Sequence, residues 1–259
     1  MTKKYPSAAK VVIIGGGVIG CSVAYHLTKY GWKDVVLLER DRLTSGTTWH
    51  AAGLVSQLGP SAAVTKIRKY TLDLYKNLEK EVDHSAGLRL NGALSIAQTD
   101  SRWQELKRQA TTAQLYDVDL RILDKSEIKK RYPMMSNEDL KGGVLMPGDG
   151  SADPSGVTHM LAKGARKGGA KIYEQSPVET ILTKNGRVHG VRVNGQDIEC
   201  EYVVLATGMW SRQIGEKIGV SIPLYPAEHF YVITEPIEKL SPTLPVIRDF
   251  DSSVYFKED

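Results

Sequence analysis

Cysteine, phenylalanine and long apolar runs are scarce in this 259-residue sequence. It holds 2 cysteines and 3 phenylalanines, and Cys21 and Cys200 lie far apart inside apolar segments. This spacing suggests neither a disulfide framework nor a C-x-x-C zinc site, so we expect both thiols to be buried and no metal to be bound. The longest apolar stretch, Val11–Ile14 with its continuation to Ile19, is too short to cross a bilayer and shows no signal-peptide pattern.

Charge of one sign does not dominate either. The 34 Lys and Arg residues against 30 Asp and Glu give a formal net charge of +4, spread over the whole length. No basic run is interleaved with aromatic residues, so nucleic acid is not an expected partner, and a membrane is not expected either. The expected location is the cytoplasm, or the mitochondrial matrix if the source is eukaryotic. The chain is long enough for one large domain or two small ones.

The first forty residues follow the pattern of one βαβ unit. The apolar run Val11–Ile14 predicts a strand, which enters three consecutive glycines. A second strand is predicted at Val35–Leu38, ending at the acidic Glu39. Between them, apolar residues at helical spacing predict a helix that ends before Gly31: Ile19, Val23, Leu27 and Tyr30.

The glycine pattern Gly15-x-Gly17-x-x-Gly20 fits the dinucleotide fingerprint. A phosphate can sit at the N-terminus of the following helix, where main-chain N–H groups and the helix dipole stabilise negative charge. Such triplets also occur in plain loops, but here the motif follows a strand and opens a helix. Glu39 lies about twenty residues on, where a carboxylate accepts ribose hydroxyls and disfavours a 2′-phosphate. Its alternative role is an exposed strand-end carboxylate, and the pattern leaves NAD and FAD open.

An amphipathic helix and several turns are predicted beyond this unit. The helix covers about residues 61–81, where one face is apolar: Ala63, Ile67, Tyr70, Leu74 and Leu78. Residues 88–97 predict two strands joined at Asn91-Gly92. Asp124 and Glu127 have the spacing of a capping box, ahead of a short helix that ends before Pro133.

The α/β pattern returns at Asp153, which caps a helix predicted to run to about residue 167. Strands are expected at 171–173 and on either side of Asn185-Gly186 and Asn194-Gly195. The last of them, at about 202–205, enters the turn Ala206-Thr207-Gly208. The alternating residues 223–234 predict a further strand.

The segment from Thr44 to Leu54 is rich in hydroxyl groups and small residues, and it contains His50. Such residues offer hydrogen bonds and close main-chain approach just past the pyrophosphate turn, where a flavin would lie. From composition alone, a Ser/Thr loop with a structural histidine is an equal alternative.

Several stretches together carry a family resemblance. They are the glycine triplet, Glu39-Arg40, the string from Gly46 through Thr48-Trp49-His50-Ala51-Ala52-Gly53-Leu54, and Ala206-Thr207-Gly208. With them the sequence, from about residue 11 to its end, resembles the dimethylglycine dehydrogenase and sarcosine dehydrogenase family of FAD-dependent amine oxidoreductases. The T-W-H-A-A-G-L string is specific, whereas the glycines and the A-T-G turn are shared by many flavoproteins.

The resemblance implies an α/β fold in which a Rossmann-like FAD-binding domain, residues 1–85 and 151–220, is interleaved with an α+β substrate domain, residues 86–150 and 221–259. Relatives continue further, so the last segment is expected to be incomplete and the fold truncated at its C-terminal end. The region that follows in relatives binds folate, which implies tetrahydrofolate there.

The resemblance also implies site residues. The histidine of the string carries the flavin covalently in this family, so His50 is expected to hold FAD through a ring nitrogen. Val178 is implied on the adenine side and Trp210 beyond the A-T-G turn, although both could equally be core residues. The other implied FAD contacts are Gly15, Gly17, Val18, Ile19, Gly20, Glu39, Arg40, Gly46, Thr47, Thr48, Trp49, Gly53, Leu54, Ala206 and Gly208.

The implied activity is oxidation of a small N-methyl amino acid, such as dimethylglycine or sarcosine, by hydride transfer from the N-methyl carbon to flavin. His229 and Tyr255 are the nearest matches to catalytic residues of relatives, although a lone strand histidine is more often structural. The electron acceptor would be an electron-transfer flavoprotein or oxygen. Two alternatives stay open: a general amino-acid or glycine oxidase with non-covalent FAD, and a non-catalytic relative resembling the pyruvate dehydrogenase phosphatase regulatory subunit.

Overall fold

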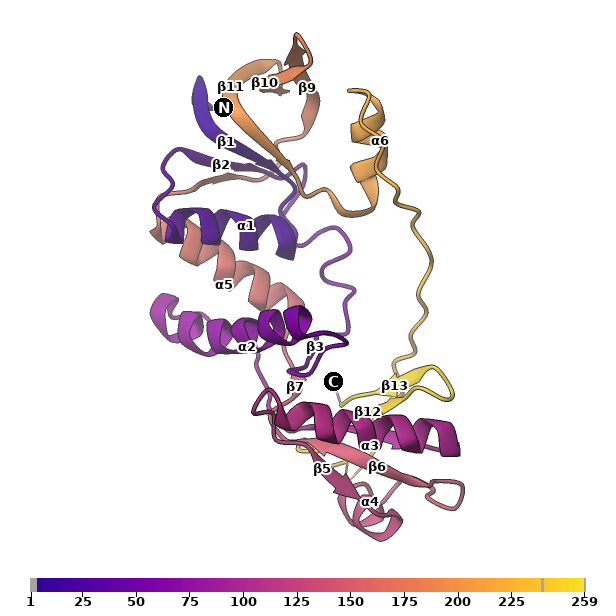
Figure 1. Cartoon of the computed structure of the whole chain (residues 1–259). Coiled ribbons are helices and arrows are strands. Elements are labelled where there is room, and N and C mark those ends of the chain that lie inside the picture. The colour runs from indigo at the N-terminus through magenta and orange to yellow at the C-terminus, as the bar shows by residue number, and fades with distance from the viewer. Residues whose placement is uncertain (1–3, 239, 259) are drawn as a thin grey trace. The chain divides into compact units, whose positions relative to one another are not determined.

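The computed structural model describes residues 4–238 and 240–258, and its contacts divide the chain into two compact units (Figure 1). The first unit holds residues up to 51, 77–86 and 153–231, and the second holds 52–76, 87–152 and the residues from 232 on. Unlike the predicted division, residues 52–76 group with the second unit. The reason is pairing: β3 (Leu54–Val55) bonds to β7 (Gly150–Ser151). The assignment of the units to FAD and substrate stays a prediction.

A six-stranded sheet forms the centre of the first unit, in the order β8-β2-β1-β11-β10-β9. The strands β8, β2, β1 and β11 run parallel, and β11, β10 and β9 form an antiparallel meander. Both faces of the parallel part are covered, so Val35–Leu38 is buried at every residue. The strand bounds are β1 Ala8–Ile14, β2 Val35–Leu38, β8 Lys171–Tyr173, β9 Val178–Lys184, β10 Arg187–Val193 and β11 Gln196–Leu205.

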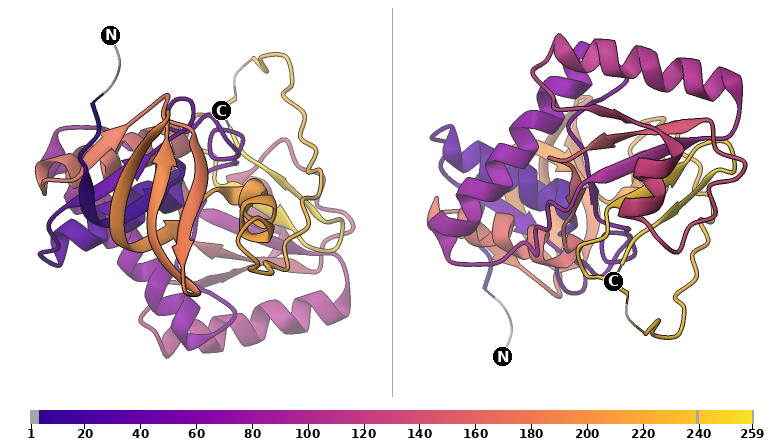
Figure 2. Two further views of the ribbon diagram at one scale, coloured as in Figure 1. Left: turned by 90° about the horizontal axis from the view of Figure 1, so that it is seen from above. Right: turned by 90° about the horizontal axis from the view of Figure 1, so that it is seen from below.

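Two helices lie on one face of this sheet and the meander folds over the other. Helix α1 (Val18–Lys29) contacts β1 and β2 and packs on α5 (Pro154–Lys167). Figures 1 and 2 show the orange β9–β11 strands over the indigo β1, on the side away from α1. After β11 come the short helices η1 (Gly208–Trp210) and α6 (Ser211–Glu216). The core between the meander and the sheet includes Val12, Ile14, Val36, Leu38, Ile181, Val191, Val193 and Ile198.

The second unit contains a five-stranded sheet in the order β13-β12-β4-β6-β5. Its apolar core combines Leu94, Leu145 and Ile247 from the sheet with Ile128 of α4. Helix α2 begins in this unit and its last residues belong to the first. The bounds are α2 Ala62–Val82, β4 Ala93–Ala97, α3 Asp100–Gln114, β5 Arg121–Leu123, α4 Lys125–Arg131, β6 Gly142–Met146, β12 Val246–Asp249 and β13 Val254–Phe256.

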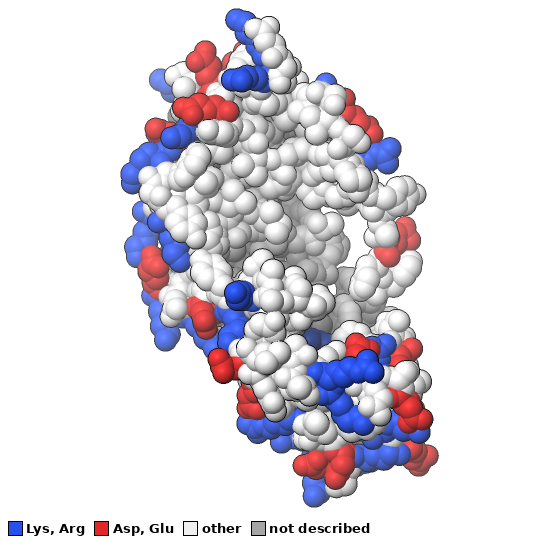
Figure 3. All heavy atoms as spheres, viewed as in Figure 1, with Lys and Arg blue, Asp and Glu red and all other residues white. Residues whose placement is uncertain are grey.

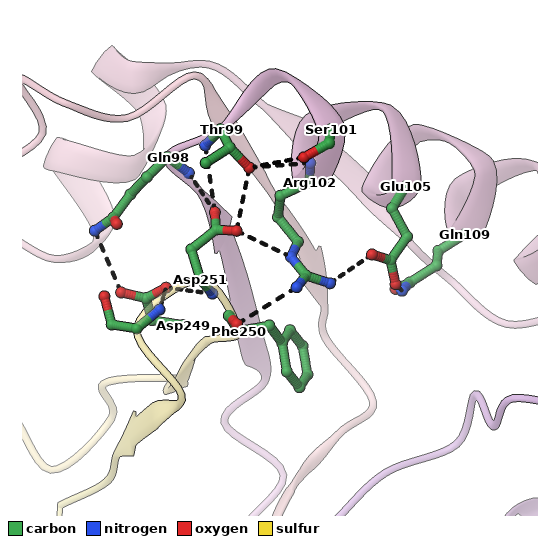
Figure 4. A network of polar contacts seen from close by, with 10 residues as sticks. Gln98, Thr99, Ser101, Arg102, Glu105, Gln109, Asp249, Phe250 and Asp251 are labelled. Carbon is green, nitrogen blue, oxygen red and sulfur yellow. Dashed lines mark hydrogen bonds and ion pairs between the residues drawn. The ribbon is translucent and has the colours of Figure 1, made fainter.

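A polar network ties the β12–β13 turn to the start of α3 (Figure 4). The Asp251 carboxylate accepts hydrogen bonds from the N–H groups of Gln98 (2.9 Å) and Thr99 (3.3 Å) and from the Thr99 hydroxyl (3.1 Å). Arg102 Nε lies 3.4 Å from the same carboxylate. Burial raises the pKa of Asp251, but these hydrogen bonds outweigh it, so the pKa is lowered. The ionised form of Asp251 therefore stabilises this turn.

Most local predictions are confirmed. Asp124 and Glu127 form the capping box, with both N–H bonds at 2.9 Å, and α4 ends at Arg131. Asp153 caps α5 through the N–H groups of its first turn. Both Asn-Gly turns join the predicted strands, and both cysteines are buried.

Two predicted strand regions are wrong. Residues 88–92 form no strand beside β4; instead Arg89 bridges to Ser151, and the Asn91 amide donates to the Leu244 carbonyl. Residues 221–236, which include His229, form neither helix nor strand. Alternating residues become a strand only where a neighbouring strand pairs with their main chain, and none among the described residues does so here.

Two surface features bear on partners. On the face drawn in Figure 3, Lys and Arg lie beside Asp and Glu where charged side chains gather, and a broad area of this face carries neither. Among the described residues, no helix combines the length and the apolar character needed to cross a bilayer.

Candidate functional site

The glycine turn between β1 and α1 packs main chain against main chain. Gly15 has φ +110°, and a Cβ there would overlap the Ala206 carbonyl oxygen. A Cβ on Gly20 would overlap the carbonyl oxygen of Gly15. Because both obstacles are main-chain atoms, only glycine fits at these two positions. The geometry is that of a tight turn at Gly15 and of close packing of the helix start at Gly20, as the dinucleotide fingerprint requires.

Open N–H groups stand at the start of α1. Its N-cap is Gly17, which has no side chain to satisfy them. The Val18 N–H donates to Thr48 Oγ1 at 3.1 Å, whereas the N–H groups of Ile19 and Gly20 have no hydrogen-bond partner among the described residues. A helix N-terminus with unpaired donors favours an anion, and phosphate is the usual one.

Glu39 is nine-tenths buried at the end of β2 and faces this turn. Its Oε2 accepts the Gly16 N–H at 2.5 Å, and its Oε1 accepts the Asp41 N–H at 2.9 Å. The alternative of an exposed strand-end carboxylate is therefore wrong. Each carboxylate oxygen has a second lone pair, so Glu39 can still accept ribose hydroxyls.

The loop that carries His50 is fixed to the glycine turn at two points. The Thr44 N–H donates to the Gly16 carbonyl at 3.1 Å, and Thr48 Oγ1 receives the Val18 N–H. Thr44 holds a positive φ of 75°, an unusual conformation for a residue with a Cβ. The exposed rings of Trp49 and His50 lie together, with centroids 3.7 Å apart. His50 is thus two residues from a direct contact with the α1 N-terminus.

Residues after β2 and after β11 meet beside the same loop. The Arg40 guanidinium carbon lies 3.9 Å from the centre of the Trp210 ring. The Trp210 ring also borders Gly46, where a Cβ would be 3.4 Å from it, and Thr47 Oγ1 borders Gly208. The structure therefore brings together most of the predicted FAD contacts of the first unit.

Other predicted site residues lie elsewhere. Val178 packs against the core of the meander. Gly53 and Leu54 belong to the second unit, where Leu54 pairs with Ser151. His229 lies exposed in the segment without helix or strand, and Tyr255 lies on β13. The roles of these residues stay predictions.

Sequence reasoning missed Gly16 and the pair Asp149 and Arg248. A Cβ on Gly16 would contact the side chains of Leu43 and Glu39, and the run of three glycines was the available signal. Asp149 and Arg248 form a buried ion pair in the second unit. An arginine directly after the apolar pair Val246 and Ile247 was a weak signal, and its partner 99 positions away was not visible in the sequence.

The first unit, with a glycine turn on a parallel sheet, is of the dinucleotide-binding class. The profile of the family described as DAO, FAD dependent oxidoreductase, matches residues 10–259. The chain therefore belongs to the FAD-dependent oxidoreductase family.

Among curated relatives, mitochondrial sarcosine dehydrogenase of Homo sapiens is 40% identical over 99% of this chain, and mitochondrial dimethylglycine dehydrogenase of Homo sapiens is 36% identical over 99%. The chain spans 28% and 30% of the lengths of these two proteins. The crystal structure of L-proline dehydrogenase from P. horikoshii matches with a TM-score of 0.88 and 28% identity, over 97% of this chain and 67% of that one. The predicted family resemblance and α/β fold are confirmed.

Proposed function

We propose that the glycine turn binds FAD and that the chain belongs to an enzyme that oxidises an N-methyl amino acid, with hydride transfer from the N-methyl carbon to flavin. The proposal rests on the glycine turn, where neighbouring main-chain atoms leave no room for a Cβ at Gly15 or Gly20. Beside this turn, the N–H groups of Ile19 and Gly20 have no hydrogen-bond partner among the described residues. The names of the two human relatives support the class of substrate.

The residues present fit the pyrophosphate and ribose of FAD. The Ile19 and Gly20 N–H groups would donate to phosphate oxygens, and Glu39 would accept ribose hydroxyls. Bound FAD would supply the hydride acceptor, while the protein orients the amine and keeps water out. His229 and Tyr255 are proposed to take up the amine proton and position the substrate, because only an amine with a free lone pair can give up hydride.

His50 is proposed to bind the flavin covalently. The loop before it is anchored at Gly16 and Val18, which supports the proposal because His50 follows two residues after the Thr48 contact with the α1 N-terminus. After acid denaturation and precipitation, the wild-type protein should give a yellow pellet and His50→Ala a colourless one. His159→Ala removes an exposed histidine of α5 and serves as the control. Flavin released into the wild-type supernatant would reject the bond, though not FAD binding.

Substrate class is tested by anaerobic flavin bleaching with glycine, sarcosine and dimethylglycine, using the full chain. Bleaching by the methylated compounds over glycine is the expected result. Bleaching by glycine alone would favour a glycine oxidase, and no bleaching with any amine would favour a regulatory protein. The electron acceptor, whether an electron-transfer flavoprotein or oxygen, and any use of tetrahydrofolate belong to the same proposal.

A further inference from the structure

The Glu39 segment, residues 39–44, is held on one side by residues 173–176. The Glu39 N–H donates to the Tyr173 carbonyl at 2.8 Å, and the Glu39 carbonyl accepts the Ser176 N–H at 2.7 Å. These two bonds continue the parallel pairing of β2 with β8 beyond the last residues of both strands. The main chain of Glu39 is therefore fixed on both sides of its Cα.

Glu174 holds the same segment further along, through its side chain. Its Oε1 accepts the Leu43 N–H at 2.8 Å, and the neighbouring Gln175 N–H donates to the Asp41 carbonyl at 2.7 Å. Gln175 adopts a positive φ of 48°, which is unusual for a residue with a Cβ. A charged acceptor makes a stronger hydrogen bond than a neutral one, so the bond from Leu43 to Glu174 is expected to be the strongest of these contacts.

The other side of the Glu39 segment contacts the glycine turn. Leu43 is buried, and its side chain lies where it would obstruct a Cβ on Gly16. The next residue, Thr44, donates its N–H to the Gly16 carbonyl. A shift of Leu43 would therefore disturb the contacts that place the Glu39 carboxylate against Gly16.

Residues 173–176 have a buried support of their own. Ser176 is fully buried, and its hydroxyl donates to the Glu174 carbonyl at 2.9 Å while it accepts the Tyr5 hydroxyl at 2.9 Å. Tyr5 is also buried, and its oxygen accepts the side-chain amide of Asn194 at 2.8 Å. Glu174 thus stands on a turn whose position is set independently of the Glu39 segment.

We propose that Glu174 is a positioning residue for FAD, which acts through Leu43 to hold the Glu39 carboxylate where it accepts the ribose hydroxyls. The inference rests on the proposed FAD site, because Glu39 meets a ribose only there. Since Glu174 acts through Glu39, its removal should weaken only those ligands that carry the ribose hydroxyls. A merely structural role would weaken ligands with and without them alike.

The test uses ADP and 2′,3′-dideoxyadenosine diphosphate, which keeps the adenine and the pyrophosphate but lacks the hydroxyls. Both are titrated calorimetrically into the full chain in a His50→Ala background, freed of flavin by dialysis against potassium bromide. Glu174→Ala should weaken ADP by about threefold to tenfold and leave the dideoxy analogue within about twofold. Glu174→Gln keeps an oxygen acceptor for the Leu43 N–H and should restore most of the ADP affinity.

Glu79→Ala is the matched control. Glu79 Oε1 accepts the Ala86 N–H at 3.1 Å, so this substitution also removes a partly buried bond from a main-chain N–H to a Glu carboxylate. It should leave both affinities within about twofold. If Glu174→Ala does not fold, Glu174→Asp replaces it, because the shorter side chain draws the carboxylate away from Leu43, and the same discrimination is expected.

Wild-type ADP affinity in a folded Glu174→Ala protein would overturn the inference, as would equal weakening of the two ligands. Either result would leave the proposed FAD site standing. A background chain that binds ADP and the dideoxy analogue equally would reject the ribose role of Glu39 and the inference with it. A background chain that binds no added FAD would reject the proposed FAD site itself.

Discussion

Alanine at Gly20 should disrupt the glycine turn, whereas alanine at Gly17 should leave the fold intact and weaken FAD binding. The two substitutions add the same methyl group three residues apart. At Gly20 the methyl overlaps the Gly15 carbonyl oxygen, which belongs to the main chain and cannot rotate away. At Gly17 it comes within 2.9 Å of Thr48 Oγ1, a side-chain atom that can move.

The expected sizes differ accordingly. Overpacking against main chain costs about 1–3 kcal/mol, and the upper end is expected at Gly20 because α1 itself must shift. Gly17 has φ −76°, which suits alanine, so the loss there is the Thr48 hydrogen bond to Val18, worth about 1 kcal/mol. In a domain of this size each kcal/mol lowers Tm by about 2–4 °C. Gly20→Ala should therefore lower Tm by about 6–12 °C and Gly17→Ala by about 2–4 °C.

Thermal denaturation of the apo proteins followed by circular dichroism, and FAD titration followed by flavin fluorescence, measure the two effects. Gly17→Ala should raise the Kd for FAD by about tenfold or more, because the methyl lies where main chain approaches pyrophosphate. Ile19→Ala, at the exposed side chain between the two, is a control for the Tm measurement alone, because Ile19 is itself an implied FAD contact. Equal losses of Tm at Gly17 and Gly20, or wild-type FAD affinity in Gly17→Ala, would refute the reasoning.

Three further outcomes are expected. The folded-state pKa of Asp251 is lowered, so its stabilisation is present above the unfolded-state pKa and is lost as pH falls through the folded-state pKa. The free energy of unfolding, measured with urea, should therefore fall more steeply with decreasing pH in wild type than in Asp251→Asn. Burial raises the pKa of Cys21 to about 12, so iodoacetamide at pH 8 should label it only after unfolding, and native-state labelling at the unfolded rate would contradict this. Asp153→Ala should lower the free energy of unfolding by about 1 kcal/mol, and Asp153→Asn should restore most of it; a loss that asparagine does not restore would argue against capping.

The elements predicted correctly are those whose cause lies within a few residues. The capping box at Asp124, the Pro154 helix start and the Asn-Gly turns each depend on contacts inside one turn of chain. The glycine turn belongs to the same group, because the strand, the tight turn and the helix start that define it lie within a few residues of one another. The closure of this turn by the Ala206 carbonyl was not predicted; the family resemblance implied Ala206 only as an FAD contact.

The errors arise where distant residues decide. Residues 221–236 alternate like a strand, but alternation does not show whether a neighbouring strand exists. Asn91-Gly92 looks like a hairpin turn, yet Asn91 donates to Leu244, more than 150 positions away. Asp149 lies in the turn between β6 and β7, and its partner Arg248 lies in β12. No pattern of neighbouring residues indicates that the two are paired.

The pairing of β1 with β11 also constrains how the protein is made. Residues 8–14 leave the ribosome early, but their strand partner, residues 199–205, is synthesised almost two hundred residues later. Until then one edge of the nascent sheet stays open, and the glycine corner lacks the Ala206 carbonyl that closes it. FAD capture during translation must therefore wait for the A-T-G turn, and ribosome-bound chains that stop before it should not retain flavin.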